Sequence, residues 1–250
     1  MDAKGQFGLS YTEDFNVACA ISYLKQEDVL RYFINRVSFY AFNGGEMEAV
    51  ALSSTHIILD CREFAQAGVT PVSDRKVRLI SIKYISLLSD LAANTHLSTV
   101  DKMKESFYIM QEWETEMMPL VDFPKTFYLD EDQFLVLTFD FNLVCRMNGL
   151  NPQQVLQYFI DRISLARERA LKIIGFAHSD ACMSLFGMMK LSRSMKQYKL
   201  PVQLEIQQWY HEKLLILDGK LKNEPDLDKR TTGYQAFYAE WYHTLQRNLN

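Results

Sequence analysis

The stretch FNVACAISYLKQEDVLRYFINRVS at residues 15–38 recurs 126 positions later as FNLVCRMNGLNPQQVLQYFIDRIS at residues 141–164. Eleven of the 24 positions are identical and the alignment needs no gap, which far exceeds chance similarity. A long self-similar segment indicates an internal tandem duplication. We therefore predict two related halves, residues 1–125 and residues 126–250, arranged about a pseudo-twofold axis as two domains or packed as one globular unit.

The composition favours long helices over sheets. Glycine and proline number 10 and 6 in 250 residues, roughly half of their average usage. Folds built only from strands use these two residues at their many turns. Hydrophobic residues make up 48% and charged residues 23% of the chain, which is typical of a globular protein and excludes disordered and fibrous classes. We therefore predict an all-α fold.

The spacing of apolar residues predicts five helical segments in each half, and hence about ten helices in the chain. In the first half we expect them at 12–23, 26–42, 46–67, 75–94 and 98–118. In the second half we expect them at 130–148, 152–174, 179–197, 202–217 and 232–248, with a polar loop over 218–232. Ser98 with Asp101, and Asn151 before Pro152, are residue types that begin helices.

Residues 134–145 fit two interpretations. Phe134, Leu137 and Phe141 recur at helical spacing, and Asn148 with Gly149 is suited to end a helix. The same segment also alternates apolar and other residues in the way that a half-buried strand does. We favour the helix because of its end signals, and the strand stays an alternative.

Cysteine usage and the terminal sequence bear on compartment. The four cysteines form no CxxC pair, so the sequence predicts neither a zinc or redox motif nor a disulfide framework. The opening MDAKGQFGLSYTEDFN lacks the features of a signal peptide, and no run reaches the about 18–20 apolar residues of a membrane span. The formal net charge of −4 argues against wholesale coating of nucleic acid. We expect a cytoplasmic protein of bacterial type.

Residues 145–159, CRMNGLNPQQVLQYF, place a small residue, a glycine, an apolar residue, a capping residue and an aromatic pair in series. This order resembles the helix-turn-helix of tetracycline-repressor type regulators, and the matching residues are Cys145, Gly149, Leu150, Asn151, Tyr158 and Phe159. The resemblance implies a DNA-binding element at about 139–162, whose second helix enters the major groove. It directs Gln153, Gln154 and Gln157 toward bases or phosphates. Packing of two antiparallel helices accounts for the same residues without DNA.

Positive charge is concentrated in the second half. Between residues 162 and 199 eight basic residues face only two acidic ones. Arg162, Arg167 and Arg169 follow the predicted reading helix and are candidates for contact with nucleic acid or another anion. The segment 182–199 combines an apolar side with basic residues near its end and could dock an anionic partner. The alternative is a core-facing helix whose lysines only interact with solvent.

Catalytic and metal-binding patterns are sparse. Glu240 and His243 have the spacing used by carboxylate-bridged metal sites in helical bundles, but such a site needs a second pair and further carboxylates. The sequence holds no HExxH zinc motif, no glycine-rich nucleotide or phosphate loop, and no GxSxG elbow. We therefore predict no cofactor, no catalytic residue and no enzymatic activity. A carboxylate–histidine metalloprotein stays the second alternative to a binding function.

The leading functional hypothesis is a helical binding protein that recognises a protein partner or a small ligand. It is motivated by the repeat, by the aromatic content of 13% and by the missing catalytic motifs. Trp209 and Trp241 lie in the densest aromatic segments, 207–215 and 237–245. We expect Trp113, Trp209 and Trp241 to anchor helix packing, and the alternative is that they line a pocket between the two halves. The alternative is a DNA-binding transcriptional regulator that uses the helix-turn-helix. The oligomeric state is left open.

Overall fold

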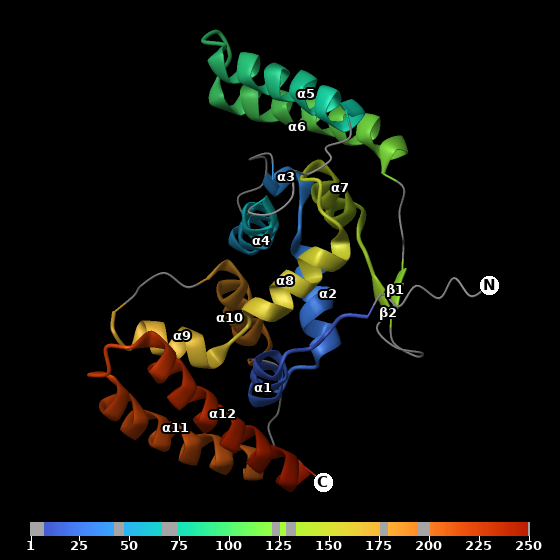
Figure 1. The fold of residues 1–250 in the computed structure, drawn as a ribbon. Coiled ribbons are helices and arrows are strands. Elements are labelled where there is room, and N and C mark those ends of the chain that lie inside the picture. The colour runs from blue at the N-terminus through green and yellow to red at the C-terminus, as the bar shows by residue number, and fades with distance from the viewer. Residues whose placement is uncertain are drawn as a thin grey trace, which may run out of the picture. The chain divides into compact units, whose positions relative to one another are not determined.

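The computed structural model describes residues 8–42, 48–66, 75–121, 126–128, 134–175, 180–194 and 201–249. Within them the chain forms twelve α-helices and one short two-stranded ribbon, which confirms the predicted all-α class (Figure 1). The helices are α1 (Glu13–Ile21), α2 (Gln26–Arg36), α3 (Phe39–Phe42), α4 (Ala49–Gln66), α5 (Arg75–Ala93), α6 (Thr99–Met117), α7 (Phe139–Met147), α8 (Pro152–Arg162), α9 (Leu165–Lys172), α10 (Ala181–Ser194), α11 (Pro201–Leu221) and α12 (Leu227–Leu249). A 3-10 turn, η1 (Met118–Leu120), follows α6. Strand β1 (Thr126–Tyr128) pairs antiparallel with β2 (Phe134–Val136).

Two of the predicted helices are each divided in two, which accounts for twelve helices among the described residues where about ten were expected. The segment predicted at 26–42 forms α2 and α3, and the segment predicted at 152–174 forms α8 and α9. In each case a serine begins the second helix: Ser38 Oγ accepts a hydrogen bond from the Ala41 amide at 3.3 Å, and Ser164 Oγ accepts one from the Arg167 amide at 3.1 Å. Side-chain capping by serine outweighs the continuous helical spacing there.

The prediction of a single helix at 130–148 is wrong at residues 134–136. Residues 134–136 form β2, and α7 begins only at Phe139, so the strand and the helix each occupy part of the ambiguous segment. Thr138 sets the start of α7 because its side chain accepts a hydrogen bond from the Phe141 amide at 3.2 Å. Residues 130–133 lie outside the described residues.

The polar loop predicted at 218–232 is also wrong in extent, because α11 continues to Leu221 and α12 begins at Leu227. Asp218 is buried within α11, where it accepts a hydrogen bond from the hydroxyl of Tyr234 at 2.8 Å. Asp226 starts α12 by accepting hydrogen bonds from the amides of Asp228 and Lys229 at 2.9 and 3.3 Å. Polar residues in this segment therefore serve as a buried contact and a helix cap.

The contacts divide the chain into two compact units. Unit 1 comprises Met1–Leu9 and Arg31–Tyr158, and unit 2 comprises Ser10–Leu30 and Phe159–Asn250. The division falls within α2 and within α8. These units follow contacts, whereas the predicted halves 1–125 and 126–250 follow sequence similarity, so the predicted halves stay a prediction.

Unit 1 holds its aromatic core between α3, α6 and the neighbouring helix α5. Trp113 on α6 is fully buried, stacks on Tyr84 of α5 with ring centres 5.8 Å apart, and meets Phe39 of α3 edge-on at 5.2 Å. Helix α7 packs against α3 and α4, and its Phe141 meets Phe33 of α2 edge-on at 5.6 Å. Edge-on and offset ring pairs of this kind stabilise beyond the buried area alone.

Unit 2 is built around α12, which packs against α9, α1 and α11. Its core contains Tyr210 of α11 and Trp241 of α12, whose rings stack at 5.2 Å with planes 4° apart. Tyr234 and Tyr238 of α12 belong to the same buried cluster. Each unit therefore contains a hairpin of two long helices, α5–α6 or α11–α12, with a tyrosine stacked on a buried tryptophan.

The first helices of the two predicted halves lie in the opposite units. Helix α1, from residues 1–125, packs on α9 and α12 in unit 2, whereas α7, from residues 126–250, packs on α3 and α4 in unit 1. Their bounds, 13–21 and 139–147, are both 126 positions apart, and so are the bounds of α2 and α8, 26–36 and 152–162.

The corners that follow α1 and α7 have matching backbone geometry. Tyr23 and Gly149, again 126 positions apart, have positive φ values of 56° and 68°. The Leu24 amide donates to the Cys19 carbonyl at 2.9 Å, and the Leu150 amide donates to the Cys145 carbonyl at 3.0 Å. These are the hydrogen bonds of a helix end closed by one left-handed residue.

Candidate functional site

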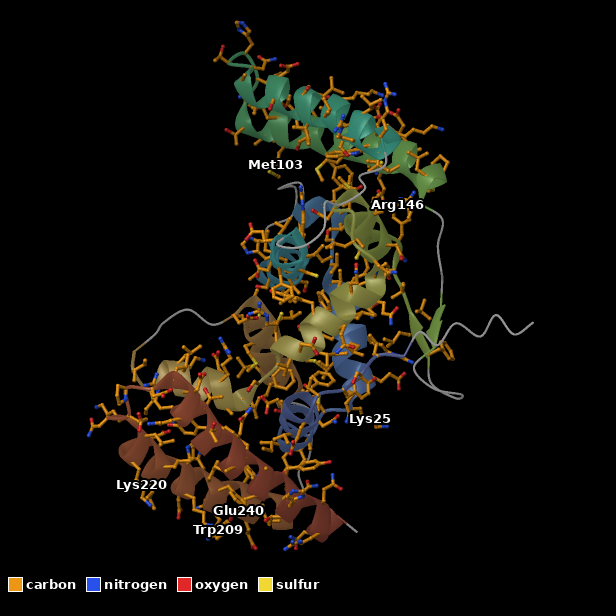
Figure 2. The ribbon with its side chains drawn as sticks, viewed as in Figure 1. Lys25, Met103, Arg146, Trp209, Lys220 and Glu240 are labelled. Carbon is orange, nitrogen blue, oxygen red and sulfur yellow. The ribbon has the colours of Figure 1, made fainter. Side chains whose placement is uncertain are left out.

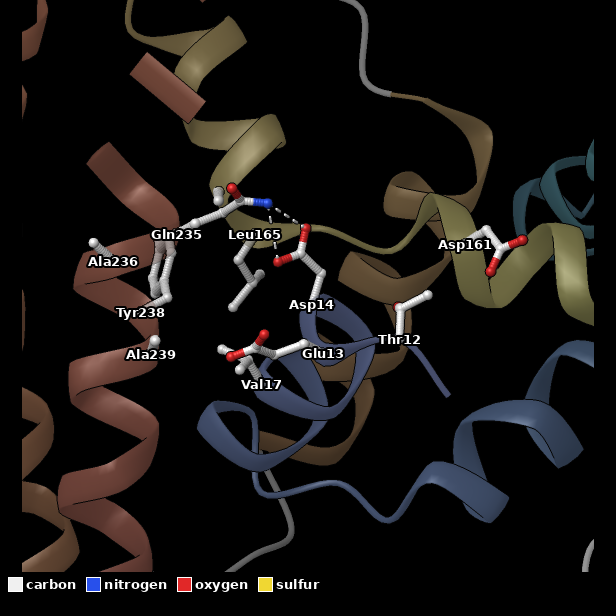
Figure 3. Close-up of a pocket in the computed structure, with 11 residues that line it drawn as sticks. Thr12, Glu13, Asp14, Val17, Asp161, Leu165, Gln235, Ala236, Tyr238 and Ala239 are labelled. Carbon is white, nitrogen blue, oxygen red and sulfur yellow. Dashed lines mark hydrogen bonds between the residues drawn. The ribbon is translucent and has the colours of Figure 1, made fainter. Parts of the chain in front are cut away.

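A pocket with a volume of about 470 Å³ lies in unit 2, where α1, α8, α9 and α12 contribute its walls (Figure 3). Its lining residues are Thr12, Glu13, Asp14, Val17, Asp161, Leu165, Ala166, Gln235, Ala236, Tyr238 and Ala239. A volume of this size lies within the roughly 300–1,000 Å³ of small-molecule sites. This pocket is the candidate functional site.

The start of α1 supplies the polar rim of the pocket. Thr12 caps the helix by accepting a hydrogen bond from the Phe15 amide at 3.2 Å, and Glu13 and Asp14 form the first turn. Carboxylates are favourable there because the N-terminal end of a helix carries partial positive charge. The side-chain amide of Gln235 on α12 donates to the carboxylate of Asp14 at 3.2 Å, as Figure 3 shows.

The inner wall of the pocket is apolar. Val17, Ala166 and Tyr238 are buried members of the unit 2 core, and Leu165 packs against it. Burial raises the pKa of Tyr238 to about 12, so this hydroxyl is neutral at physiological pH. The pocket therefore joins an apolar interior to a carboxylate rim.

The charge of the lining is of one sign. Glu13, Asp14 and Asp161 are acidic, and none of the described residues that line the pocket is basic. Because like charges gathered around a low-dielectric wall attract counter-ions, the pocket favours a positively charged group over an anion.

The predicted repeat pairs two of the residues that line this pocket with aromatic residues of unit 1. Tyr40 of α3 stacks on Phe107 of α6 with ring centres 5.6 Å apart, and the Tyr40 hydroxyl donates to Glu114 at 3.1 Å. In unit 2 the equivalent of Tyr40 is Ala166, 126 positions later. The equivalent of Phe107 is Gln235, 128 positions later.

The buried residues of α6 and α12 give the offset of 128 positions between these two helices. Met110, Trp113 and Met117 are the buried residues of α6, and Tyr238, Trp241 and Leu245 are buried at the matching positions of α12. Under the predicted repeat, Ala166 and Gln235 correspond to the two stacked rings of unit 1, and both residues line the pocket.

Sequence reasoning missed this pocket, although one signal was available. The ungapped alignment of 15–38 with 141–164 extends by two positions to Tyr40 and Ala166, where a large side chain is replaced by a small one. The correspondence of Phe107 with Gln235 could not be found from the sequence, because the alignment of the later parts of the two halves needs gaps. The matching burial patterns of α6 and α12 identify that equivalence.

The predicted reading helix α8 offers little exposed surface. Of its residues, Gln154 and Asp161 are exposed, whereas Gln153 and Gln157 are half-buried. Gln154 and Asn151 cap the helix: the Asn151 amide donates to Gln154 at 3.2 Å, and the Gln153 amide donates to Asn151 at 2.9 Å. Gly149 closes the corner between α7 and α8. The helix-turn-helix assignment and the binding of DNA both stay predictions.

The three arginines predicted to contact an anion lie in unit 2, and two of them form ion pairs with carboxylates. Arg162 lies 3.4 Å from Asp180, and Arg169 makes a two-pronged ion pair with Asp218. Burial favours the neutral form of Asp218, but hydrogen bonds from Arg169 and Tyr234 outweigh it and lower the pKa of this carboxyl. Arg167 is exposed.

The three predicted pocket tryptophans are divided between the units. Trp113 lies in unit 1, whereas Trp209 and Trp241 lie in unit 2. Trp209 is 49% exposed on α11, with the Lys213 ammonium 3.6 Å from its ring centre (Figure 2). The indole N–H groups of Trp113 and Trp241 are buried without a hydrogen-bond partner among the described residues. No tryptophan lines the pocket described above, and a pocket between the halves stays a prediction.

The basic segment at 182–199 forms most of α10. Cys182, Leu185 and Met189 are buried, so its apolar side faces the core, while Lys190 is exposed. The side chains of Arg193, Lys196 and Lys199 lie outside the described residues.

The metal-binding alternative finds no geometric support in the part of the chain that the structure describes. No group of three or more His, Cys, Asp or Glu side chains there could hold a metal ion. Glu240 instead accepts a hydrogen bond from Lys213 at 3.1 Å. Among the described helices, none is both long enough and apolar enough to cross a bilayer.

No family model, curated protein or solved structure matches this chain.

Proposed function

We propose that this protein is a helical binding protein whose unit 2 pocket holds a small organic cation, an ammonium or guanidinium group carried on an apolar body. The observation that carries the proposal is the exchange of two stacked rings, Tyr40 and Phe107, for Ala166 and Gln235. Tyr40 is half-buried and Phe107 is 51% exposed, so the two rings cover the surface of unit 1 at this place, whereas unit 2 has an open pocket beside Ala166 and Gln235. An open volume kept at one of two equivalent places is therefore better explained by a ligand than by packing.

We infer that the two halves descend from a tandem duplication. The 11 identities in 24 positions support this origin, as do the equal bounds of α1 and α7 and the matching corners at Tyr23 and Gly149. Duplication leaves one copy free to keep the packed core while the other changes. In this protein the first half carries Tyr40 and Phe107, while the second half carries Ala166 and Gln235 at the corresponding positions.

The chemistry of the lining selects the ligand class. Glu13 and Asp14 present carboxylates at the rim, and charge-assisted hydrogen bonds to an ammonium or guanidinium are stronger than neutral ones. The wall formed by Val17, Leu165 and Tyr238 accommodates an apolar chain. We assign the rim carboxylates Glu13 and Asp14 to pairing with the cation, and we propose binding without catalysis.

Isothermal titration with cations of this class tests the proposal. Spermidine and agmatine are expected to bind, whereas glutarate and the neutral 1,4-butanediol are not. Ala166→Tyr, which restores the ring of the other half, is expected to abolish binding while the far-UV circular dichroism stays unchanged. Ala93→Tyr, at an exposed position on α5, is the matched control and should bind as the wild type does. Equal binding by Ala166→Tyr and the wild type, or binding of glutarate alone, would contradict the proposal.

DNA binding through α7 and α8 is the competing hypothesis, and it needs a substitution that leaves the fold intact. Reversing Arg162 or Arg169 would break ion pairs with Asp180 and Asp218. Arg167 and Gln154 are exposed, so Arg167→Glu with Gln154→Glu tests contact with phosphates directly. Salt-dependent DNA binding that this pair of substitutions removes would favour the competing hypothesis.

A further inference from the structure

The carboxylates that line the unit 2 pocket come from two separate helices. Glu13 and Asp14 belong to the first turn of α1, whereas Asp161 belongs to α8. Figure 3 shows Asp161 apart from the other two carboxylates, with Thr12 drawn between them in this view. The pocket therefore presents negative charge at two places rather than at one.

The position of Asp161 within α8 is unfavourable for the helix itself. Helix α8 ends at Arg162, so Asp161 lies in its last turn. The C-terminal end of a helix carries partial negative charge and favours cations over carboxylates. Glu13 and Asp14 lie at a helix N-terminus, where carboxylates stabilise the helix. Helix stability therefore accounts for the carboxylates of α1 but not for Asp161.

The predicted repeat pairs Asp161 with an uncharged residue. The corresponding position, 126 residues earlier, is Asn35 on α2. Extending the same alignment toward the N-terminus pairs Glu13 with Phe139. A structural role shared by the two copies therefore does not account for the charge of Asp161 or of Glu13, and both of these residues line the pocket.

The remaining lining is mainly apolar. Val17, Leu165 and Tyr238 contribute hydrocarbon and aromatic surface to it. A chain of methylene groups gains free energy by leaving water for such a wall. An ammonium group at each end of that chain would form charge-assisted hydrogen bonds with the carboxylates of α1 and of α8.

We propose that the unit 2 pocket selects a linear diamine, with one ammonium paired with Glu13 and Asp14 and the other paired with Asp161. This inference rests on the proposed cation site and adds a second anchor to it. A ligand with one ammonium pairs with the carboxylates of one helix only. A second ammonium on the same chain binds intramolecularly once the first is in place, which raises the affinity without a larger pocket. The ligand class narrows from organic cations to those that carry positive charge at both ends.

Isothermal titration with 1,4-diaminobutane and butylamine tests the proposal, because the two differ by one ammonium group on the same carbon chain. The wild type is expected to bind the diamine roughly tenfold more tightly. Asp161→Asn, which matches Asn35 of the first half, should weaken diamine binding by about tenfold and leave butylamine binding nearly unchanged. Asp228→Asn removes the same charge at an exposed position on α12 outside the pocket lining, and it should bind both amines as the wild type does.

Two further measurements distinguish the two anchors from each other and from a role in folding. Glu13→Gln should weaken the binding of both amines, because it removes a carboxylate that either ligand uses. Asp161→Asn should not lower the urea midpoint of unfolding, since a carboxylate in the last turn does not stabilise the helix.

The outcomes separate this inference from the proposed function. Equal affinity of the wild type for the two amines, or an equal loss of both in Asp161→Asn, overturns the second anchor and leaves the cation site standing. A wild type that binds neither amine overturns the cation site and the diamine inference together.

Discussion

At the residue scale, Gly149 is a position whose positive φ favours glycine over other residues. It closes the corner between α7 and α8 with φ 68°. Gly149→Ala should lower the free energy of unfolding by about 1–2 kcal/mol, because a Cβ is disfavoured in the left-handed region. Gly219→Ala is the opposite control, since this glycine lies within α11 and an added Cβ there meets nothing within 4 Å. It should raise the free energy of unfolding by about 0.5–1 kcal/mol. Urea denaturation measures both, and a smaller loss at Gly149 than at an ordinary surface site would contradict the assignment.

Tyr23 occupies the equivalent corner without being a glycine. Its φ is 56°, and its ring packs against the unit 2 core, with the hydroxyl donating to the Gln203 carbonyl at 3.4 Å. Packing of the ring offsets the backbone strain. For this reason the turn signal was readable from the sequence at Gly149 and absent at Tyr23, although the two corners have the same shape.

Asp218 makes stability depend on pH. Its pKa in the folded state is lowered from 3.8, so its contribution is fully present above the ordinary carboxyl value and is lost as the pH falls through the folded-state value. Asp218→Asn should lower the free energy of unfolding by about 2 kcal/mol near neutral pH. The difference from the wild type should shrink in acid. Asp90→Asn, an exposed acid on α5, is the control. A difference that stays constant with pH would contradict the ion pair.

The four cysteines should be inert in the folded protein. All are free and buried. Burial raises the pKa of Cys19 to about 12 and the pKa of Cys61 to about 11, and the pKa of Cys145 lies well above its ordinary value for the same reason. Because the thiolate is the reactive form, iodoacetamide at mildly alkaline pH should label none of them until denaturant is added. Rapid labelling of the native protein, read by mass spectrometry, would disprove their burial.

At the element scale, periodicity located the helices but not their interruptions. Helix α5 was predicted at 75–94 and occupies Arg75–Ala93, because its apolar spacing has no competing cap. Ser98 and Asp101 predicted the start of α6, and the Asp101 amide donates to Ser98 Oγ at 3.2 Å. The breaks at Ser38 and Ser164 were missed since serine is neutral inside a helix and only its hydrogen bond reveals a cap.

The break between α8 and α9 gives a direct test. Ser164→Ala should lower the free energy of unfolding by about 1 kcal/mol, because the Arg167 amide loses its capping partner. Ser86→Ala, at an exposed position within α5, should change stability by no more than about 0.5 kcal/mol and in the stabilising direction. Equal effects of the two substitutions in chemical denaturation would show that Ser164 does not cap α9.

At the scale of the whole molecule, the sequence predicted the repeat but not which helices pack together. Identity between 15–38 and 141–164 predicts a repeat, whereas packing depends on contacts between residues far apart in the chain. Helix α1 packs on α9 and α12, and α7 packs on α3 and α4. The pocket was missed for the same reason, since Asp14, Ala166 and Gln235 come from three separate elements.

A double substitution in unit 1 distinguishes the effect of open volume on cation binding from the effect of the carboxylates. Tyr40→Ala with Phe107→Gln removes the stacked pair and should lower the free energy of unfolding by about 1 kcal/mol. The new space should bind neither spermidine nor agmatine, because the position equivalent to Glu13 carries Phe139 and Asp140 already accepts a hydrogen bond from the Phe39 amide at 2.9 Å. Calorimetric titration of this variant in a background that carries Ala166→Tyr gives the measurement. Cation binding there would show that volume alone suffices.

The most direct test of ligand binding in unit 2 is a two-dimensional amide NMR titration of the wild-type chain with spermidine. We expect shifts confined to residues 12–17, 161–166 and 235–239, the segments that line the pocket. Residues 39–41 and 106–110, at the equivalent place in unit 1, should not shift. Shifts centred on unit 1, or no saturable shift at all, would contradict the proposed cation site.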